Sequence, residues 1–193
     1  MKEAIIKAFE ESIRVKRAFL RDNVDTLIKV IDAITAVFRS GNKLLLFGNG
    51  GSAADAQHLV AELVGRFREE RRALPAIALT ADTAILTAVG NDYGYERVFA
   101  RQVEALARAG DVLLALSTSG NSANVLQAAQ TARTLGCTVI AFTGAGGGAL
   151  AGHADLLIKA PSTVVARIQE MHTLCIHAIC EALDALIRAQ ERS

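Results

Sequence analysis

A histidine and a glutamate stand four residues apart in a segment with the apolar spacing of a helix. His58 and Glu62 would therefore lie on one helix face, and Arg66 continues the row at the same interval. A histidine and a glutamate at this spacing can bind one metal ion together. The competing interpretation is a solvated polar face, which on spacing alone is the commoner outcome.

A second polar row, formed by Gln169, Thr173 and His177, runs along the last expected helix at the same interval. That helix is otherwise apolar, so a glutamine or histidine on it needs a hydrogen-bonding partner. If the two rows face each other, they offer four metal ligands, namely His58, Glu62, Gln169 and His177.

Two Gly/Ser-rich loops each follow a short apolar run and lead into a helical pattern. The runs 43–47 and 111–116 are typical of buried parallel strands, and ligands of such sheets lie at the carboxyl ends of the strands. The second loop (117–122, the serine loop) carries hydroxyls and no Lys or Arg, which predicts a phosphate held by neutral hydrogen bonds. The chain is therefore expected to bind a phosphorylated small molecule through Ser52, Ser117, Thr118, Ser119 and Ser122.

The first loop also has the letters of a dinucleotide-binding fingerprint, G-x-G-x-x-A over 48–53. The acidic residue that should bind a ribose about 20 residues further on is missing from its place, since Asp82 lies too far along the chain. The sequence contains no P-loop motif of nucleoside triphosphatases. A plain tight turn between strand and helix is the simplest alternative, but the serine loop favours a shared phosphate site.

Other polar residues have ordinary structural interpretations. His172 lies on an apolar stripe and is expected to be a hydrogen-bonded core histidine, while His153 follows a glycine in a loop and is expected at the surface. Asn91 and Asp92 have the composition of a turn before a helix. There, Asp92 could cap the helix or take a polar role in the pocket.

From Lys43 onward, strand patterns alternate with helical ones. The expected strands are 43–47, 76–79, 111–116, 137–142 and 155–159, and the expected helices are 52–69, 83–90, 94–108, 122–134 and 163–190. This alternation predicts an α/β fold, a three-layer sandwich around a five-stranded parallel sheet.

Residues 3–39 show only helical spacing, with a break near Asp22 and Asn23, which can cap a second helix. We therefore expect two N-terminal helices before the sheet. Their apolar stripe is longer than one small sheet layer needs, which favours contact with another subunit. The expected organisation is a single domain over 1–193, with 1–40 as a helical oligomerisation extension.

The 193 residues carry 21 basic and 20 acidic side chains, a formal net charge of +1. This balance gives no electrostatic basis for binding nucleic acid or an anionic membrane. The sequence has no run of about 18 apolar residues that could span a membrane and no signal-peptide core at its N-terminus. The three cysteines lack CxxC spacing and lie in apolar patterns, so buried thiols in a reducing cytoplasm are expected.

Together, these motifs resemble the sugar isomerase (SIS) domain family, and within it the phosphoheptose isomerases. The similarity covers nearly the whole chain. The serine loop alone marks sugar-phosphate binding, whereas the pair of Glu62 and His177 is far more specific. The resemblance rests on FGNGGS (47–52), H-x-x-x-E with Arg66 (58–66), GNDYG (90–94), GDVLL (110–114), STSGNS (117–122) and RIQE-x-H-x-x-x-x-H (167–177).

The resemblance implies a flavodoxin-like SIS fold and the conversion of sedoheptulose 7-phosphate to D-glycero-D-manno-heptose 7-phosphate, the first step toward the ADP-heptose of the lipopolysaccharide core. It also implies a cytoplasmic homotetramer that binds a phosphorylated seven-carbon sugar and one zinc ion per subunit, at His58, Glu62, Gln169 and His177. The expected substrate-binding residues are Asn49, Gly50, Gly51, Ser52, Arg66, Asn91, Asp92, Ser117, Thr118, Ser119, Ser122 and Gln169. One departure is Ala166, where some members carry Asp, so any help from that carboxylate is absent here.

A ketose–aldose interconversion moves a proton between C1 and C2 through an enediol(ate). It needs a base at the carbon and an acid or a metal at the oxygens. We assign Glu62 as the base and His177 as the group that moves protons on the oxygens. A carboxylate bound tightly to zinc is a poor base. Either the metal polarises the carbonyl while a neighbour moves the proton, or the zinc mainly holds the site together.

Three other functions compete with this interpretation. The main rival is a non-catalytic tetramer of the same family that binds the bacterial replication initiator protein and has non-catalytic residues at the positions of Glu62 and His177. A dehydrogenase is a more distant alternative. A regulator that senses sugar phosphates is disfavoured, because no helix-turn-helix domain or basic patch accompanies the unit.

Overall fold

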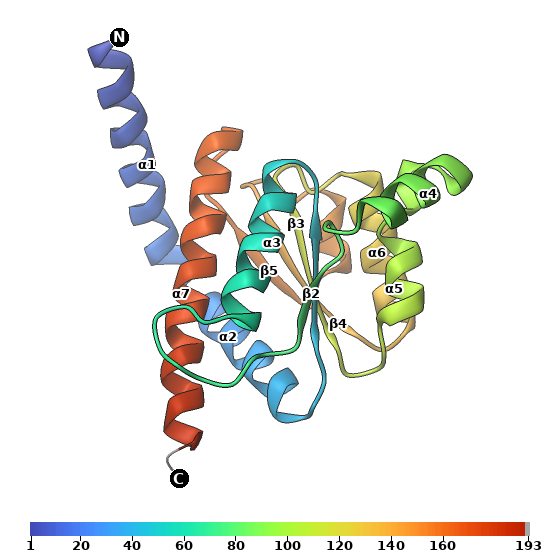
Figure 1. The fold of residues 1–193 in the computed structure, drawn as a ribbon. Coiled ribbons are helices and arrows are strands. Elements are labelled where there is room, and N and C mark those ends of the chain that lie inside the picture. Colours follow the sequence, from blue (N-terminus) through green and yellow to red (C-terminus); the bar gives the residue numbers. More distant parts are fainter. Residues whose placement is uncertain (192–193) are drawn as a thin grey trace.

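Five parallel strands form one sheet at the centre of the molecule (Figure 1). The computed structural model describes residues 1–191, so positions 192 and 193 of the expected domain lie outside the described residues. The strands are β1 (Leu44–Gly48), β2 (Ala76–Ala78), β3 (Val112–Ser117), β4 (Thr138–Thr143) and β5 (Leu156–Lys159), in the spatial order β2-β1-β3-β4-β5. Every neighbouring pair is parallel. The predicted sheet is confirmed, and each strand boundary differs from the prediction by at most one residue.

Helices cover both faces of this sheet. One face carries α2 (Val24–Arg39), α3 (Gly51–Val64) and α7 (Val165–Glu191), and the other carries α5 (Ala100–Leu106) and α6 (Ala123–Thr134). The remaining elements of the α/β unit are α4 (Thr83–Tyr93) and two short 3-10 turns, η1 (Tyr95–Arg97) and η2 (Ala149–His153). The predicted three-layer α/β sandwich is confirmed.

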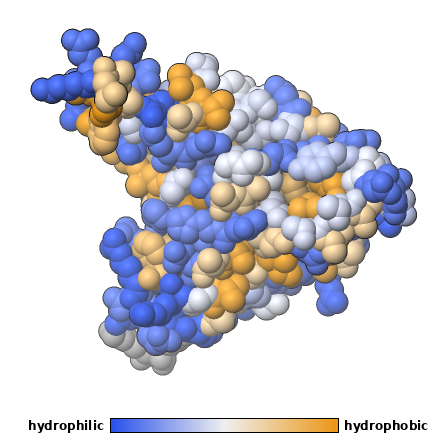
Figure 2. All heavy atoms as spheres, turned by 45° about the horizontal axis from the view of Figure 1, so that its top comes forward, coloured by the Kyte–Doolittle hydropathy of each residue, from blue (hydrophilic) through white to orange (hydrophobic). Residues whose placement is uncertain are grey.

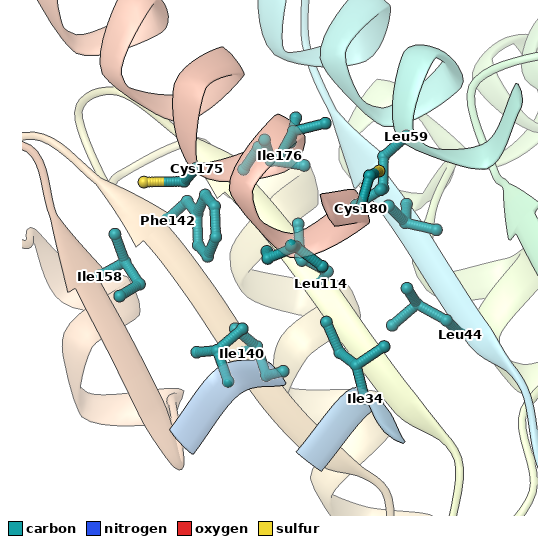
Figure 3. Packing of buried hydrophobic residues seen from close by; sticks show 14 of the residues in the cluster. Ile34, Leu44, Leu59, Leu114, Ile140, Phe142, Ile158, Cys175, Ile176 and Cys180 are labelled. Atoms are coloured by element: carbon teal, nitrogen blue, oxygen red, sulfur yellow. The ribbon is translucent and has the colours of Figure 1, made fainter. Parts of the chain in front are cut away.

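Both faces of the sheet are apolar because side chains alternate along each strand. In β1, Leu44 and Leu46 belong to one core cluster, whereas Leu45 and Phe47 belong to the other. Figure 3 shows the first cluster, in which strand residues meet side chains from α2, α3 and α7. This burial explains why the strands appear in the sequence as continuous apolar runs rather than as alternating patterns.

The strand order brings two loops together at the carboxyl edge of the sheet. β1 and β3 are neighbours, but the chain continues from β1 to β2 on one side and from β3 to β4 on the other. This is the switch point at which α/β sheets of flavodoxin-like order bind ligands. Gly48 lies so close to β3 that a Cβ there would be 2.8 Å from the carbonyl oxygen of Leu116, which explains the need for glycine.

The first helix, α1 (Lys2–Asp22), projects away from the rest of the chain (Figure 1). Only Val15 and Phe19 of α1 are buried, while the side chain of Phe9 is 69% exposed. Figure 2 shows apolar patches on the protruding end of the molecule, among hydrophilic residues. The predicted break is present at Asn23, between α1 and α2. No described helix is long and apolar enough to cross a membrane.

Three helix predictions need correction. The helix expected over 52–69 ends at Val64, because the guanidinium of Arg71 takes the carbonyls of Glu62 and Leu63, which a continuing helix would use itself. The helix expected over 94–108 is divided into η1 and α5. The helix expected over 83–90 continues to Tyr93, so Asn91 and Asp92 lie in its last turn rather than in a turn before a helix.

Candidate active site

The serine loop closes on itself between β3 and α6. The hydroxyl oxygens of Ser117 and Ser122 lie 3.2 Å apart, and the Gly120 amide donates to Ser117 Oγ at 3.1 Å. The Asn121 amide donates to Ser119 Oγ at 3.1 Å. Gly120 has a positive φ of 67°, which favours glycine at this tight turn. The loop therefore gathers the predicted hydroxyls at the start of α6, where free amides attract anions.

A second loop, residues 144–148 (the glycine loop), supports the serine loop from behind. The Gly144 amide donates to the carbonyl of Thr118 at 3.0 Å, and just beyond the glycine loop, in η2, the Leu150 amide donates to the carbonyl of Gly120 at 2.9 Å. A cavity of about 260 Å³ opens between these loops and the start of α7, and Thr118 and Ser119 line it. This cavity offers room for an anion beside two of the predicted hydroxyls.

The loop after β1 is tied to the serine loop by a reciprocal pair of amide hydrogen bonds. Asn49 Nδ2 donates to Asn124 Oδ1, and Asn124 Nδ2 donates to Asn49 Oδ1, both at 2.9 Å. Tyr95 in η1 approaches from the other side, with its hydroxyl 3.5 Å from Asn49 Oδ1. Ser52 is buried in the first turn of α3. Asn124 was missed at the sequence level, although its place directly after the serine loop was a usable signal.

The two polar rows face each other across the contact between α3 and α7. His58 Nε2 lies 3.3 Å from Glu62 Oε1, and the rings of His58 and His177 meet edge to face with centroids 5.0 Å apart. Phe67 stacks on the other side of His177 at 5.8 Å. Glu62 is 24% exposed and His58 is 39% exposed, so the group is reachable from solvent. His58 therefore links Glu62, on its own helix, to His177 on α7.

Further up the same contact, Asp55 of α3 accepts a hydrogen bond from Thr173 Oγ1 of α7 at 2.9 Å. The second carboxylate oxygen, Oδ2, is buried and has no hydrogen-bond partner within the described residues. Burial raises the pKa of Asp55, although the Thr173 hydrogen bond and the nearby His58 and His177 oppose that shift. The contact between Asp55 and Thr173 could not be foreseen, because spacing does not reveal which rows meet.

The side-chain amide of Gln169 lies against the backbone of Gly51, in the space that a Cβ at that position would need. Gln169 therefore covers the first turn of α3, one helical turn from Thr173. Gly50 stands just before this turn with a positive φ of 54°. Gly50, Gly51 and Gln169 therefore lie where the loop after β1 meets the polar rows of α3 and α7.

The donor set around His58 suits zinc, which binds imidazole nitrogen and carboxylate oxygen. The 3.3 Å between His58 Nε2 and Glu62 Oε1 also matches the separation of two ligands in a tetrahedral site with bonds of about 2.0–2.1 Å. Within residues 1–191, however, no three His, Cys, Asp or Glu side chains already surround a common point. His177 and Gln169 would have to turn toward the pair to complete a zinc site.

Three predicted binding residues lie apart from this group. Arg66 is exposed beyond the end of α3, so it does not continue the helical row of His58 and Glu62. Asn91 and Asp92 are exposed at the end of α4 and bond to each other at 2.8 Å. The structure thus leaves these three side chains outside the cluster within one subunit.

The other two histidines are accounted for separately. His172 is fully buried, its Nε2 lies 3.1 Å from the carbonyl of Thr143, and burial lowers its pKa to about 4. The prediction of a hydrogen-bonded core histidine is therefore confirmed. His153 ends η2 beside Gln130 and takes no part in the cluster.

Comparison with known proteins identifies the family. The family model described as SIS domain matches residues 8–144. The chain belongs to the SIS domain family. It is 54% identical over 180 residues to a phosphoheptose isomerase from Roseiflexus sp. (strain RS-1), covering 93% of this chain and 91% of that protein. It is also 52% identical over 187 residues to a phosphoheptose isomerase from Aquifex aeolicus (strain VF5), covering 97% and 98%.

A solved structure of a phosphoheptose isomerase from Neisseria gonorrhoeae has the same fold, with a TM-score of 0.91 and 45% identity. The match covers 95% of this chain and 98% of that one. Within the SIS domain family, the chain therefore belongs with the phosphoheptose isomerases, as the motifs of its sequence predicted.

Proposed function

We propose that this chain is an aldose–ketose isomerase that converts sedoheptulose 7-phosphate to D-glycero-D-manno-heptose 7-phosphate. One observation carries the proposal: His58 contacts both Glu62 and His177 and so joins α3 to α7, and α3 begins at the carboxyl edge of the sheet, where the hydroxyl-lined serine loop also lies. Identity above 50% to named phosphoheptose isomerases over nearly the full chain supports the substrate.

In this proposal the serine loop holds the phosphate and fixes the far end of the sugar. Ser117, Ser119 and Ser122, with Thr118 and the buried Ser52, supply neutral hydrogen bonds. The carbonyl end of the sugar then reaches the facing rows. Because an open-chain heptose is long, this division lets one loop bind and a separate pair of helices carry out the reaction.

Glu62 removes the proton from the carbon next to the carbonyl and returns it to the neighbouring carbon. His177 moves protons between the two oxygens of the enediol(ate) intermediate. The His58 ring beside Glu62 holds that carboxylate in place at 3.3 Å. Asn49 and Gln169, at the mouth of α3, are proposed to orient the sugar hydroxyls.

We further propose that His58, Glu62, Gln169 and His177 hold one zinc ion per subunit, on the strength of their donor chemistry and the His58–Glu62 separation. When bound, the ion would mainly hold α3 and α7 together at the site, which leaves proton transfer at the carbon to Glu62. The orphaned Oδ2 of Asp55 would accept a hydrogen bond from one of the two histidine rings and fix its orientation.

A homotetramer is proposed as the assembly, with residues 1–40 forming the contacts between subunits. The exposed apolar face of α1 supports this, since Phe9 is 69% and Ile5 53% exposed. Arg66, Asn91 and Asp92 would then join a site only through such an assembly. Light scattering should report a species several times the 20.4 kDa chain, and a monomer would contradict the role given to α1.

The proposed place of the reaction is the cytoplasm, at the first step toward the ADP-heptose of the lipopolysaccharide core. Three free, buried cysteines agree with a reducing compartment. The alternative of a non-catalytic partner of the replication initiator protein is less well supported, because Glu62 and His177 are both present and the matched relatives are named isomerases.

The test is direct conversion. Purified protein is incubated with sedoheptulose 7-phosphate, and the aldose product is followed by proton NMR, with fructose 6-phosphate and unphosphorylated sedoheptulose as comparison substrates. We expect conversion of the seven-carbon phosphate alone, and loss of conversion after chelation that added zinc restores. Absence of conversion in the presence of zinc would reject the function, while full activity after exhaustive chelation would reject the role of zinc.

A further inference from the structure

Arg71 is a buried arginine in the loop that joins α3 to β2 (residues 65–75, the α3–β2 loop). Its side chain is 1% exposed and its partner Asp184, on α7, is 5% exposed. Arg71 Nε donates to Asp184 Oδ1 at 2.8 Å. Its other nitrogens donate to the carbonyls of Glu62 at 2.7 Å, Leu63 at 2.9 Å and Arg72 at 3.1 Å. One side chain thus binds the end of α3, its own loop and α7.

Asp184 completes the attachment from the side of α7. Its Oδ2 accepts hydrogen bonds from the backbone amides of Arg68 at 3.0 Å and Glu69 at 3.1 Å. Burial alone would raise the pKa of Asp184, but the hydrogen bonds from Arg68, Arg71 and Glu69 hold it below its usual value. Figure 1 shows the α3–β2 loop crossing α7 on its way to β2. The loop is therefore fixed to α7 by paired, buried groups.

A second ion pair between the same loop and helix provides a contrast. Arg68 and Glu181 are 2.8 Å apart, but their side chains are 70% and 50% exposed. Exposed pairs of this kind contribute little to structure. The buried pair, by contrast, satisfies two helix-end carbonyls that would otherwise lack donors.

The buried pair is linked to both candidate catalytic residues, directly to Glu62 and through the α3–β2 loop to His177. The carbonyl that Arg71 binds at 2.7 Å is that of Glu62 itself. Phe67, in the fixed loop, stacks on His177 with ring centroids 5.8 Å apart. Asp184 lies on α7 about two turns beyond His177. Arg71 therefore contacts the backbone of Glu62, and Asp184 binds the loop that carries Phe67, the aromatic neighbour of His177.

We propose that Arg71 and Asp184 are a positioning pair that sets the distance between Glu62 and His177. The inference rests on the proposed isomerase function, because it assigns the pair to that reaction. The two reacting residues belong to helices far apart in the sequence, and a shift of about 1 Å between reacting groups can lower a rate about 100-fold. A fixed link between the end of α3 and α7 prevents such a shift.

Arg71→Lys tests the proposal. Lysine keeps the charge opposite Asp184 but cannot bind Asp184 and two carbonyls together. We expect kcat to fall roughly 10- to 100-fold, while KM and the affinity for inorganic phosphate, which report on the serine loop, stay within about two-fold. All rates are measured at a temperature at which circular dichroism shows every variant folded. Glu181→Gln, which removes the exposed pair, is the matched control and should retain the native kcat.

A spectroscopic measurement separates positioning from a loss of folded protein. The chain has four histidines, so 13C-labelled histidine gives few signals, and the ring of Phe67 should shift those of His177. Arg71→Lys and Phe67→Leu should each move the His177 signal and lower kcat, and the double variant should lose less than the product of the two effects. If Arg71→Lys does not fold, Asp184→Asn, which removes the charge opposite Arg71, provides the same two readouts.

A native kcat in Arg71→Lys overturns the proposal, as does a reduced kcat with an unmoved His177 signal. If the wild-type chain itself does not convert the heptose phosphate, the function fails. In that case the His177 signal still decides whether the pair positions that ring.

Discussion

The serine loop and the facing rows of α3 and α7 are built in opposite ways. In the serine loop, the hydrogen bond between Ser117 and Ser122 spans five positions of sequence, and the loop's other internal bonds span fewer. Between the helices, the bond from Thr173 to Asp55 joins residues 118 positions apart. A binding loop for a common group such as phosphate is thus encoded locally. The group of side chains proposed to carry out the reaction comes together only after the chain has folded.

The largest expected effect concerns Glu62. Glu62→Gln removes the proposed base but keeps the side chain's size, so turnover should fall by roughly 10²- to 10⁴-fold. Binding of sedoheptulose 7-phosphate should remain, because the serine loop is untouched. Calorimetry for binding and NMR for turnover measure the two separately. Equal losses of binding and turnover would show that binding and catalysis are not separated between the serine loop and the facing rows of α3 and α7.

Removing two hydroxyls of the serine loop should have the opposite signature. Each net hydrogen bond contributes about 0.5–1.5 kcal/mol, so Ser119→Ala with Ser122→Ala should raise KM roughly 5- to 150-fold. The value of kcat should change little. Thr134→Ala removes a hydroxyl from the other end of α6, bonded only to the carbonyl of Thr131, and serves as the control. A fall in kcat at unchanged KM would argue against phosphate binding by this loop.

His172 connects the two regions, because it sits on α7 and binds the carbonyl of Thr143 just before the glycine loop. Its pKa is lowered from 6.5 to about 4, so the folded state stays neutral while the unfolded chain takes up a proton below pH 6.5. The stabilisation is therefore complete above pH 6.5 and is lost as the pH falls toward 4. At pH 5 the lost free energy of unfolding amounts to about 2 kcal/mol.

Urea unfolding at pH 7 and pH 5 measures this dependence. The native chain should lose about 2 kcal/mol more than His172→Gln over this interval. If the native chain and His172→Gln lose the same free energy of unfolding between pH 7 and pH 5, the packing of α7 does not hold His172 in its neutral form.

The smallest predicted effect concerns the glycine loop. A methyl group at Gly144 would lie 2.8 Å from the carbonyl oxygen of Thr118 and 2.6 Å from Ile168 Cδ1, whereas one at Gly146 would meet nothing within 4 Å. Gly144→Ala should displace the serine loop and raise KM by roughly three- to ten-fold, an effect of about 1 kcal/mol. Gly146→Ala is the matched control, and equal KM values for the two variants would remove the support assigned to this loop.

The fold could be predicted because apolar runs and helical spacing decide it locally. All five strands were expected in place, since each is a short run dominated by apolar residues. The end of α3 could not be predicted, because it depends on Arg71, which binds Glu62 and Leu63 from outside the helix. Charged residues after Val64 look helical in sequence when that contact is unknown.

The site, like the fold, has features that the local sequence determines and others that depend on contacts between distant segments. The hydroxyls of the serine loop and the two polar rows were identified from residue type and spacing. Asn124 was missed although it stands two residues after the serine loop, whereas the contact of Asp55 with Thr173 was missed because it depends on which segments become neighbours. Arg66 does not continue the helical row, because α3 ends at Val64, and its role in binding stays a prediction. Substrate binding by the exposed Asn91 and Asp92 stays a prediction, which a structure of the assembled subunits would test.

Deuterium exchange in heavy water tests the central claim most directly, because it separates removal of the carbon proton from completion of the reaction. Sedoheptulose 7-phosphate is incubated with wild-type protein, Glu62→Gln and His177→Gln, and NMR follows both exchange next to the carbonyl and formation of aldose. The account predicts conversion with deuterium uptake in the wild type, neither in Glu62→Gln, and exchange that outruns conversion in His177→Gln. Exchange by Glu62→Gln at the wild-type rate would contradict it.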